Sequence, residues 1–167
     1  MGTSVTISAA DERDAEQILK LQYLCFQQEA ARYDDYRIAP LTETLAEFRA
    51  QLAHTTVLVA RLGEEIVGAV RARLDEHGTA RIARLVVHPR LQRHGLGGRL
   101  LGGVEERLGA ARYRVVTGDR SEANQRLYRR HGYAPSGLVE RDGGVALVEL
   151  VKELDAAPAS AARSAAV

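Results

Sequence analysis

The sequence is poor in the features that mark disulfide-bonded, secreted and membrane-spanning proteins. Its one cysteine, Cys25, permits no internal disulfide. Cys25 lies in an apolar helical pattern with no identifiable histidine or base partner, which favours a packed core thiol over a reactive one. No run approaches the roughly 20 apolar residues of a transmembrane helix, and the first residues lack a basic-then-apolar signal pattern. We therefore expect a cytoplasmic protein without membrane partners.

Strong charge and metal-ligand patterns are also missing. A formal net charge of +1 gives no general reason to expect binding to nucleic acid or to an anionic membrane. A chain of 167 residues, 46% hydrophobic and 27% charged, suits a single globular domain. No metal site is expected, because the histidines lack ligand spacing among themselves and with acidic residues. These histidines are His54, His77, His88, His94 and His131.

Hydrophobic periodicity predicts a mixed α/β (α+β) fold in one domain over residues 1–155. The middle of the chain is typical of a three-stranded antiparallel meander. A helix, a strand, a helix and a hairpin follow, an order that favours a mixed sheet over a regular βα alternation. The Ala-, Ser- and Pro-rich segment 156–167 is predicted to be disordered. Strands are expected at 4–9, 55–62, 65–74, 79–88, 113–117, 134–140 and 145–153, and helices at 11–31, 42–53, 95–110 and 121–131.

Residues 81–101 carry the most informative pattern: a strand ending at His88-Pro89, a basic glycine-bearing turn, and an apolar-periodic helix. The first backbone N–H groups of a helix are unpaired and lie at the positive end of its dipole, so they attract anions, and phosphate in particular. The Gly-x-x-x-x-Gly-Lys-Ser/Thr pattern of nucleotide triphosphatases is absent. A dinucleotide fingerprint is also disfavoured, because this turn follows the fourth strand and not the first. The sequence thus predicts a phosphate-bearing ligand at this turn.

Two motifs make the prediction more specific. The strand Leu85-Val86-Val87-His88-Pro89 precedes Gln92-x-x-Gly95-x-Gly97-Gly98, and the next helix carries Leu127-Tyr128-x-x-x-Gly132-Tyr133. With these motifs in this order, residues 4–152 resemble the GNAT superfamily of acetyl-CoA-dependent N-acetyltransferases. The resemblance implies a mostly antiparallel sheet of six to seven strands flanked by about four helices. It also implies direct transfer of an acetyl group from acetyl-CoA to a primary amine in a ternary complex.

By this resemblance, the main chain would hold the coenzyme. The backbone amides of residues 93–98 would bind the pyrophosphate, and the edge of residues 85–87 would pair with the pantetheine arm as another strand does. The N–H of Val86 or Val87 could polarise the thioester carbonyl. Leu85 and Val86 can also be ordinary core residues, because core packing uses their side chains and ligand pairing uses their backbone. The residues implied in coenzyme binding are Leu85, Val86, Val87, Gln92, Arg93, His94, Gly95, Leu96, Gly97, Gly98 and Asn124.

Tyr128 is the expected catalytic side chain, one helical turn after Asn124 on the same face. An amine that attacks a thioester expels a thiolate. Free thiols titrate near about 8.5 and tyrosine near about 10, so a phenol can protonate the departing sulfur. The alternative is an aromatic ring packed under the sheet, with its hydroxyl satisfied elsewhere.

The general base is not evident. Many relatives carry a glutamate where this chain has Arg81, which cannot accept a proton at neutral pH. Another carboxylate (Glu29, Asp34 or Asp35), a water chain, or an amine that arrives neutral could serve. Acidic and aromatic residues near the end of the first helix would attract a cationic amine, although exposed acids at a helix break are an equal alternative. These candidate acceptor-binding residues are Glu29, Tyr33, Asp34 and Asp35.

The expected partner is a small-molecule or peptide amine, and fold alone does not select among amines. Arg81 motivates an alternative of another class, a non-catalytic acyl-CoA-binding sensor or partner module. Nucleic-acid binding through the basic stretch 81–99 is disfavoured, because aromatic residues are not interleaved there. A homodimer through the last hairpin remains open.

Overall fold

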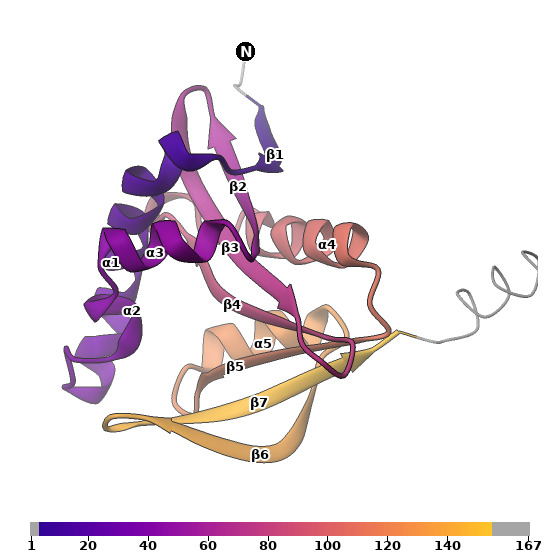
Figure 1. Cartoon of the computed structure of the whole chain (residues 1–167). Helices are drawn as coiled ribbons and strands as arrows, with labels where there is room; N and C mark the ends of the chain where they lie inside the picture. Colours follow the sequence, from indigo (N-terminus) through magenta and orange to yellow (C-terminus); the bar gives the residue numbers. More distant parts are fainter. Residues whose placement is uncertain (1–3, 155–167) are drawn as a thin grey trace, which may run out of the picture.

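The computed structural model describes residues 4–154 as a mixed α/β fold (Figure 1). The segment 156–167, predicted to be disordered, lies outside the described residues. Short 3-10 turns cover Glu12–Asp14 and Pro89–Leu91. The strands are β1 (Val5–Ala9), β2 (Thr56–Leu62), β3 (Glu65–Leu74), β4 (Thr79–Val87), β5 (Arg112–Gly118), β6 (Ala134–Asp142) and β7 (Val145–Glu153). The helices are α1 (Ala15–Tyr33), α2 (Ala39–Thr42), α3 (Leu45–Leu52), α4 (Leu96–Leu108) and α5 (Glu122–Arg130).

The strands form a seven-stranded sheet in the order β1-β2-β3-β4-β5-β7-β6. Strands β1 to β4 pair antiparallel with their sequence neighbours, and β7 pairs antiparallel with both β5 and β6. Strands β4 and β5 run parallel and are joined at Thr79–Arg81 and Arg112–Arg114. Past Arg81, no ladder joins these two strands in the described chain, and the sheet opens between them (Figure 1). The expected mostly antiparallel sheet is confirmed, and its opening positions the site.

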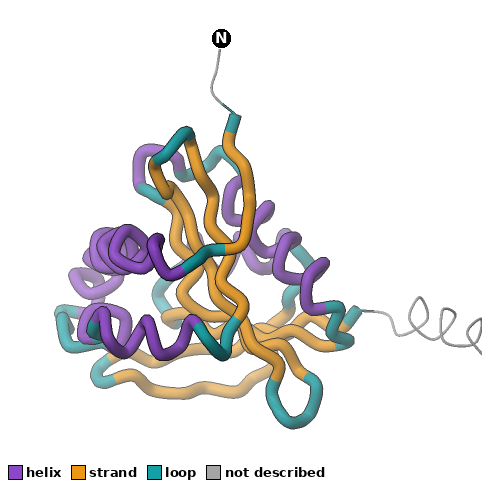
Figure 2. Tube along the Cα trace, turned by 45° about the horizontal axis from the view of Figure 1, so that its top comes forward, coloured by secondary structure: helices purple, strands orange, loops and turns teal. Residues whose placement is uncertain are grey.

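Helices cover both faces of the sheet (Figure 2). One face packs against α1 and α3 through a cluster that includes Ile18, Leu19 and Phe48. The other face packs against α4, whose Leu96, Leu100 and Val104 repeat at the spacing of one helical face. Apolar stripes on both sides therefore bury the same three strands, β2, β3 and β4.

The segment after α1 differs from the sequence prediction. One helix was expected over 42–53, but α2 and α3 are separate, which brings the helices to five instead of about four. The Thr44 hydroxyl accepts a hydrogen bond from the Glu47 N–H at 3.1 Å, and the Glu47 carboxylate accepts one from the Thr44 N–H at 2.9 Å. This capping box starts α3 afresh. Glu43, left in an extended conformation between the helices, is thereby free to enter the core.

Cys25 lies partly buried on α1, and its Sγ is 3.4 Å from the Val87 carbonyl oxygen. Burial raises the pKa of the Cys25 thiol to about 12, so the thiol stays protonated at neutral pH. Between residues 4 and 154, none of the helices is long and apolar enough to cross a membrane. The same residues contain no group of three histidine, cysteine or acidic side chains arranged to hold a metal ion.

Candidate functional site

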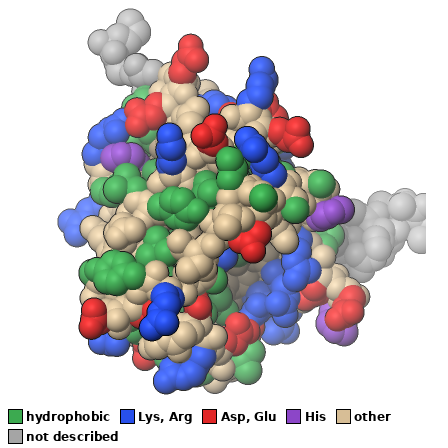
Figure 3. All heavy atoms as spheres, turned by 60° about the vertical axis from the view of Figure 1, so that its left-hand side comes forward, with side chains coloured by type: hydrophobic (Ala, Val, Ile, Leu, Met, Phe, Trp, Pro, Cys, Tyr) green, Lys and Arg blue, Asp and Glu red, His purple; other side chains and the backbone are tan. Residues whose placement is uncertain are grey.

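A cavity of about 110 Å³ opens where β4 and β5 diverge. Residues 82–85 of β4 and 116–118 of β5 form two of its walls. In the view of Figure 3, acidic and basic side chains both border a hollow in the surface. The cavity lining likewise contains both acidic and basic side chains. Its remaining lining residues are Phe26, Glu29, Ile38, Pro40, Asn124, Tyr128, Asp142, Val145 and Leu147.

Tyr128 lines this cavity from α5 and is 6% exposed. Its ring packs beside Tyr133, with 5.9 Å between ring centroids, but no hydrogen bond joins its hydroxyl to another residue of the described chain. Burial first, and then the charge of Glu29, raise the pKa of Tyr128, which keeps the phenol protonated. The packed ring thus fits the alternative of a structural aromatic residue, whereas the hydroxyl without a hydrogen-bond partner fits a proton donor.

Asn124 also lines the cavity, as the one-turn spacing from Tyr128 predicts. Its Nδ2 donates to the Ser121 hydroxyl at 2.9 Å. This bond fixes the amide and leaves the side-chain oxygen of Asn124 as an acceptor for a ligand N–H.

The start of α4 has the form expected of an anion site. Gly95 precedes the helix with a φ of 80°, a conformation that glycine adopts without strain. No side chain of the described residues caps this helix end, so the N–H groups of its first turn stay available. The exposed Arg93 has a φ of 69°, and His94 beside it is also exposed. Gln92 has a structural partner, because its Nε2 donates to the Val87 carbonyl oxygen at 3.2 Å.

The structure shows a packing role for Gly97 and Gly98 that the sequence did not reveal. A Cβ on Gly97 would lie 3.0 Å from Leu127 Cδ2, and a Cβ on Gly98 would overlap the imidazole of His131. Both glycines therefore allow α4 to approach α5 closely, whatever their contact with a ligand.

The edge of β4 that faces β5 has no strand partner over residues 82–87 of the described chain. On its other edge, Val86 and Val87 pair with Ala69 and Gly68. Val86 is buried and Leu85 partly buried, as their core role requires. The backbone of residues 85–87 therefore has an edge without a strand partner, and its pairing with an extended ligand stays a prediction.

A bulge lies within this stretch of β4. The register with β3 shifts between Ala69 and Arg71, so that Arg84 and Leu85 both lie opposite Val70. Arg84 has a φ of 55°, which costs a non-glycine residue about 1–2 kcal/mol. Bulges of this kind redirect a side chain next to functional sites, and Arg84 lines the cavity. Arg81, by contrast, is exposed and pairs with Asp75 at 3.3 Å, outside the cavity lining.

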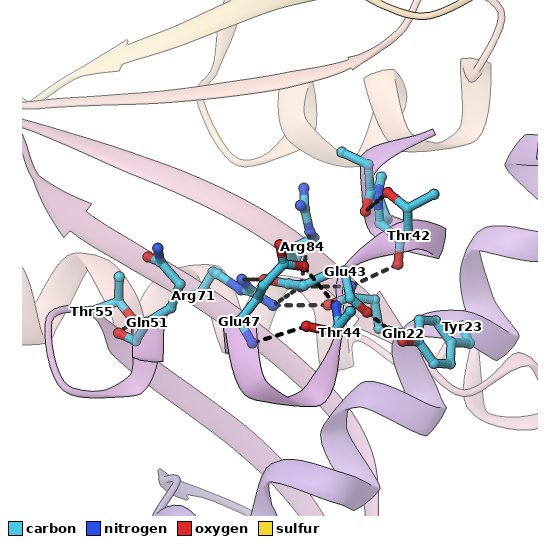
Figure 4. A network of polar contacts seen from close by, with 12 residues as sticks. Gln22, Tyr23, Thr42, Glu43, Thr44, Glu47, Gln51, Thr55, Arg71 and Arg84 are labelled. Carbon is cyan, nitrogen blue, oxygen red and sulfur yellow. Dashed lines mark hydrogen bonds and ion pairs between the residues drawn. The ribbon is translucent and has the colours of Figure 1, made fainter. Parts of the chain in front are cut away.

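A buried ionic network lies beneath Arg84 (Figure 4). Glu43 accepts hydrogen bonds from Arg71 at 2.8 and 2.9 Å and from Gln22 Nε2 at 3.0 Å. Burial acts to raise the pKa of Glu43, but the bonds from Arg71 and Gln22 outweigh it and the pKa is lowered. Gln22 also donates to the carbonyl oxygen of Pro40 at 2.8 Å, which fastens α2 as a wall of the cavity.

Of the four predicted acceptor-binding residues, Glu29 reaches the cavity. One carboxylate oxygen accepts from Arg32 at 2.6 Å, and the other lies 2.5 Å from where a Cβ on Gly118 would be. Glycine at the end of β5 thus makes room for this carboxylate. Glu29 and Tyr128 therefore line the same cavity, from α1 and α5.

The other three predicted acceptor residues lie outside the cavity lining. The Tyr33 hydroxyl donates to Asp119 at 2.6 Å and thereby ties α1 to the end of β5. Asp34 ends α1 with a φ of 49°. Asp35 accepts a hydrogen bond from the Gly144 N–H at 2.7 Å, in the turn between β6 and β7. These three residues therefore have structural positions outside the cavity, and Glu29 is the one of the four that lines it.

Sequence reasoning missed two charged lining residues, Arg84 and Asp142. Arg84 had a signal: in a strand it shares a face with Ile82 and Val86, where an apolar residue is expected. Asp142 had none, because it lies far along the chain beside a turn. Its Oδ2 accepts a hydrogen bond from the Ala39 N–H at 2.8 Å.

Comparison with known proteins identifies the family of this architecture. Residues 26–154 match the family model described as an acetyltransferase (GNAT) domain, and no curated protein sequence matches the chain. The PaiA N-acetyltransferase from Thermoplasma acidophilum in complex with coenzyme A aligns with a TM-score of 0.73 at 17% identity, covering 90% of this chain and 99% of that one. The YncA acetyltransferase from Salmonella typhimurium with acetyl-CoA aligns at 0.67 and 23%, covering 90% and 94%. The ribosomal-protein-S18-alanine N-acetyltransferase from Escherichia coli aligns at 0.71 and 15%, covering 91% and 95%.

Proposed function

Because the chain belongs to the GNAT acetyltransferase family, we propose that it transfers an acetyl group from acetyl-CoA to a primary amine. The observation that carries this proposal is one shared cavity. A protonated phenol, a carboxylate and a strand edge without a strand partner all border it, and the chain continues from that strand to the uncapped start of α4. A phosphate-bearing thioester and an amine are the pair of substrates that these groups fit together.

The main chain holds the acyl donor in this proposal. The first N–H groups of α4, after Gly95, bind the pyrophosphate. The edge of residues 85–87, which has no strand partner, pairs with the pantetheine arm and directs it into the cavity. The Val86 or Val87 N–H polarises the thioester carbonyl. The donor itself supplies an acetyl group activated by its bond to sulfur.

Two side chains move the protons. Glu29 accepts a proton from the attacking amine. Its carboxylate lines the cavity, whereas Asp34 and Asp35 lie outside the lining, and this favours Glu29 as the base. Tyr128 donates its phenolic proton to the departing sulfur. Burial raises the pKa of Tyr128, so the phenol enters the reaction protonated and gives up its proton only as negative charge develops on the sulfur. Asn124, held by Ser121, orients the donor.

The test is the release of free thiol from acetyl-CoA in the presence of a broad panel of primary amines. We expect release that depends on both substrates and yields the N-acetyl product by mass spectrometry. Tight binding of acetyl-CoA without thiol release for any amine would instead indicate the alternative, a non-catalytic acyl-CoA-binding module.

A further inference from the structure

Arg84 introduces a positive charge into a cavity that, under the proposed function, receives an amine. Arg84 lies at the bulge in β4 and lines the part of the cavity that is walled by α1 and α2, where the amine acceptor is expected. A guanidinium there repels an ammonium group, so a simple amine gains nothing from it. Its presence calls for a ligand group of negative charge.

The guanidinium of Arg84 lacks hydrogen-bond partners within the described chain. Its Nε is buried without a hydrogen-bond partner. The nearest carboxylate contact is an ion pair from Nε to Glu43 Oε1 at 3.8 Å, beyond hydrogen-bond range. The side chain is 25% exposed, so its outer N–H groups remain open toward the cavity. Buried polar groups are nearly always satisfied, so the guanidinium of Arg84 has hydrogen-bonding capacity left for a water molecule or a ligand in the cavity.

The acids around Arg84 accept hydrogen bonds from groups other than Arg84, through both oxygens in Glu43 and through one oxygen each in Asp142 and Glu29. Both oxygens of Glu43 accept hydrogen bonds from Arg71. Asp142 accepts from the Ala39 N–H, and Glu29 accepts from Arg32. No ion pair joins Asp142 or Glu29 to Arg84 in the described chain. Arg84 is therefore left with donors that these acids do not fill.

We propose that the acceptor is a small aminocarboxylate and that Arg84 binds its carboxylate while Glu29 receives its amine. This inference rests on the proposed function. A guanidinium forms forked hydrogen bonds with a carboxylate, and the acids Glu29 and Asp142 in the same cavity suit the ammonium end of such a molecule. The phosphates of the acyl donor are assigned to the α4 end, so they do not compete for Arg84.

The experiment compares matched acceptors: several amino acids, each with its decarboxylated amine and its carboxamide. Thiol release from acetyl-CoA is measured for every member, and kcat/KM is compared within each set. We expect the free acid to exceed the amine and the carboxamide by about 10-fold to 100-fold, the range of a charge-assisted hydrogen bond. Equal kcat/KM within the sets would overturn this inference and leave the acetyltransferase proposal intact. No release with any acceptor would overturn both.

Variants then assign the preference to Arg84. Arg84→Gln should lower the acid-to-amine ratio by about 10-fold to 100-fold, and Arg84→Lys should retain part of it, because the charge stays but the fork is lost. Arg73→Gln, which removes an exposed arginine from β3 outside the cavity, should leave the ratio unchanged. A folded Arg84→Gln protein with the wild-type ratio would overturn the proposal. If Arg84→Gln does not fold, Arg84→Lys provides the test, and an unchanged acid-to-amine ratio in Arg84→Lys would overturn the proposal.

Discussion

The imidazole of His131 fills the space that a Cβ on Gly98 would need. This contact between α5 and the first turn of α4 sets how closely the two helices approach. It also lies at the helix start to which the donor pyrophosphate is assigned. Helix packing and ligand binding therefore meet at one glycine.

Gly98→Ala should destabilise the fold by about 1–3 kcal/mol, the usual cost of overpacking, although alanine favours a helix interior by up to about 1 kcal/mol over glycine. Denaturant unfolding measures the change. In a His131→Ala background the clash is gone, and the same substitution should become neutral or stabilising. Equal effects in both backgrounds would show that the two residues are not coupled.

Tyr128→Phe should lower kcat by about 10-fold to 100-fold, because the sulfur then leaves without its proton donor. Affinity for acetyl-CoA should hardly change, since the ring stays packed beside Tyr133. Steady-state kinetics separates the two constants. Tyr36→Phe, which removes an exposed hydroxyl, is the matched control. Unchanged turnover in Tyr128→Phe would remove this residue from the mechanism.

Glu29→Gln should lower kcat/KM for the acceptor by about 100-fold or more, because the amide cannot accept the amine proton. Binding of acetyl-CoA, measured by calorimetry, should be retained. Glu16→Gln, on the exposed side of the same helix, should behave as the wild type. If Glu29→Gln keeps full activity, the proton goes to water or the amine arrives neutral.

The network around Glu43 predicts sensitivity to acid. The folded-state pKa of Glu43 lies below its ordinary value of 4.5, because bonds from Arg71 and Gln22 outweigh the effect of burial. A lowered folded pKa means that the stabilisation is complete above about pH 4.5 and is lost as the pH falls through the folded value. Glu43→Gln should therefore flatten the dependence of the unfolding free energy on pH below this point. An unaltered acid limb would locate the titrating group elsewhere.

Cys25 should resist alkylation in the native protein at pH 8, because burial raises its pKa to about 12 and little thiolate forms. The same reagent should label it fully in guanidinium chloride. Labelling within minutes under native conditions would contradict the packed position on α1.

The sequence predicted most of the elements because their signals are local. The apolar spacing of α4 and the turns of the meander each depend on a few adjacent residues. The split between α2 and α3 was missed although the capping pair Thr44 and Glu47 was visible, because the apolar pattern runs across it. In the site, Tyr128 and Asn124 were placed together by helical spacing. Glu29 could not be separated from Asp34 and Asp35, since a turn of helix decides which carboxylate faces the sheet.

The sequence by itself determined the family, through the glycine turn after β4 and the tyrosine motif on α5. Each motif is a short run of adjacent residues, so it can be identified without knowing which distant residues it contacts. The tertiary structure decided which charges meet. Glu29, Arg84 and Asp142 come from α1, β4 and β6, and they share one cavity because β4 and β5 part after three paired residues. Long-range packing sets that separation, and no spacing along the chain records it.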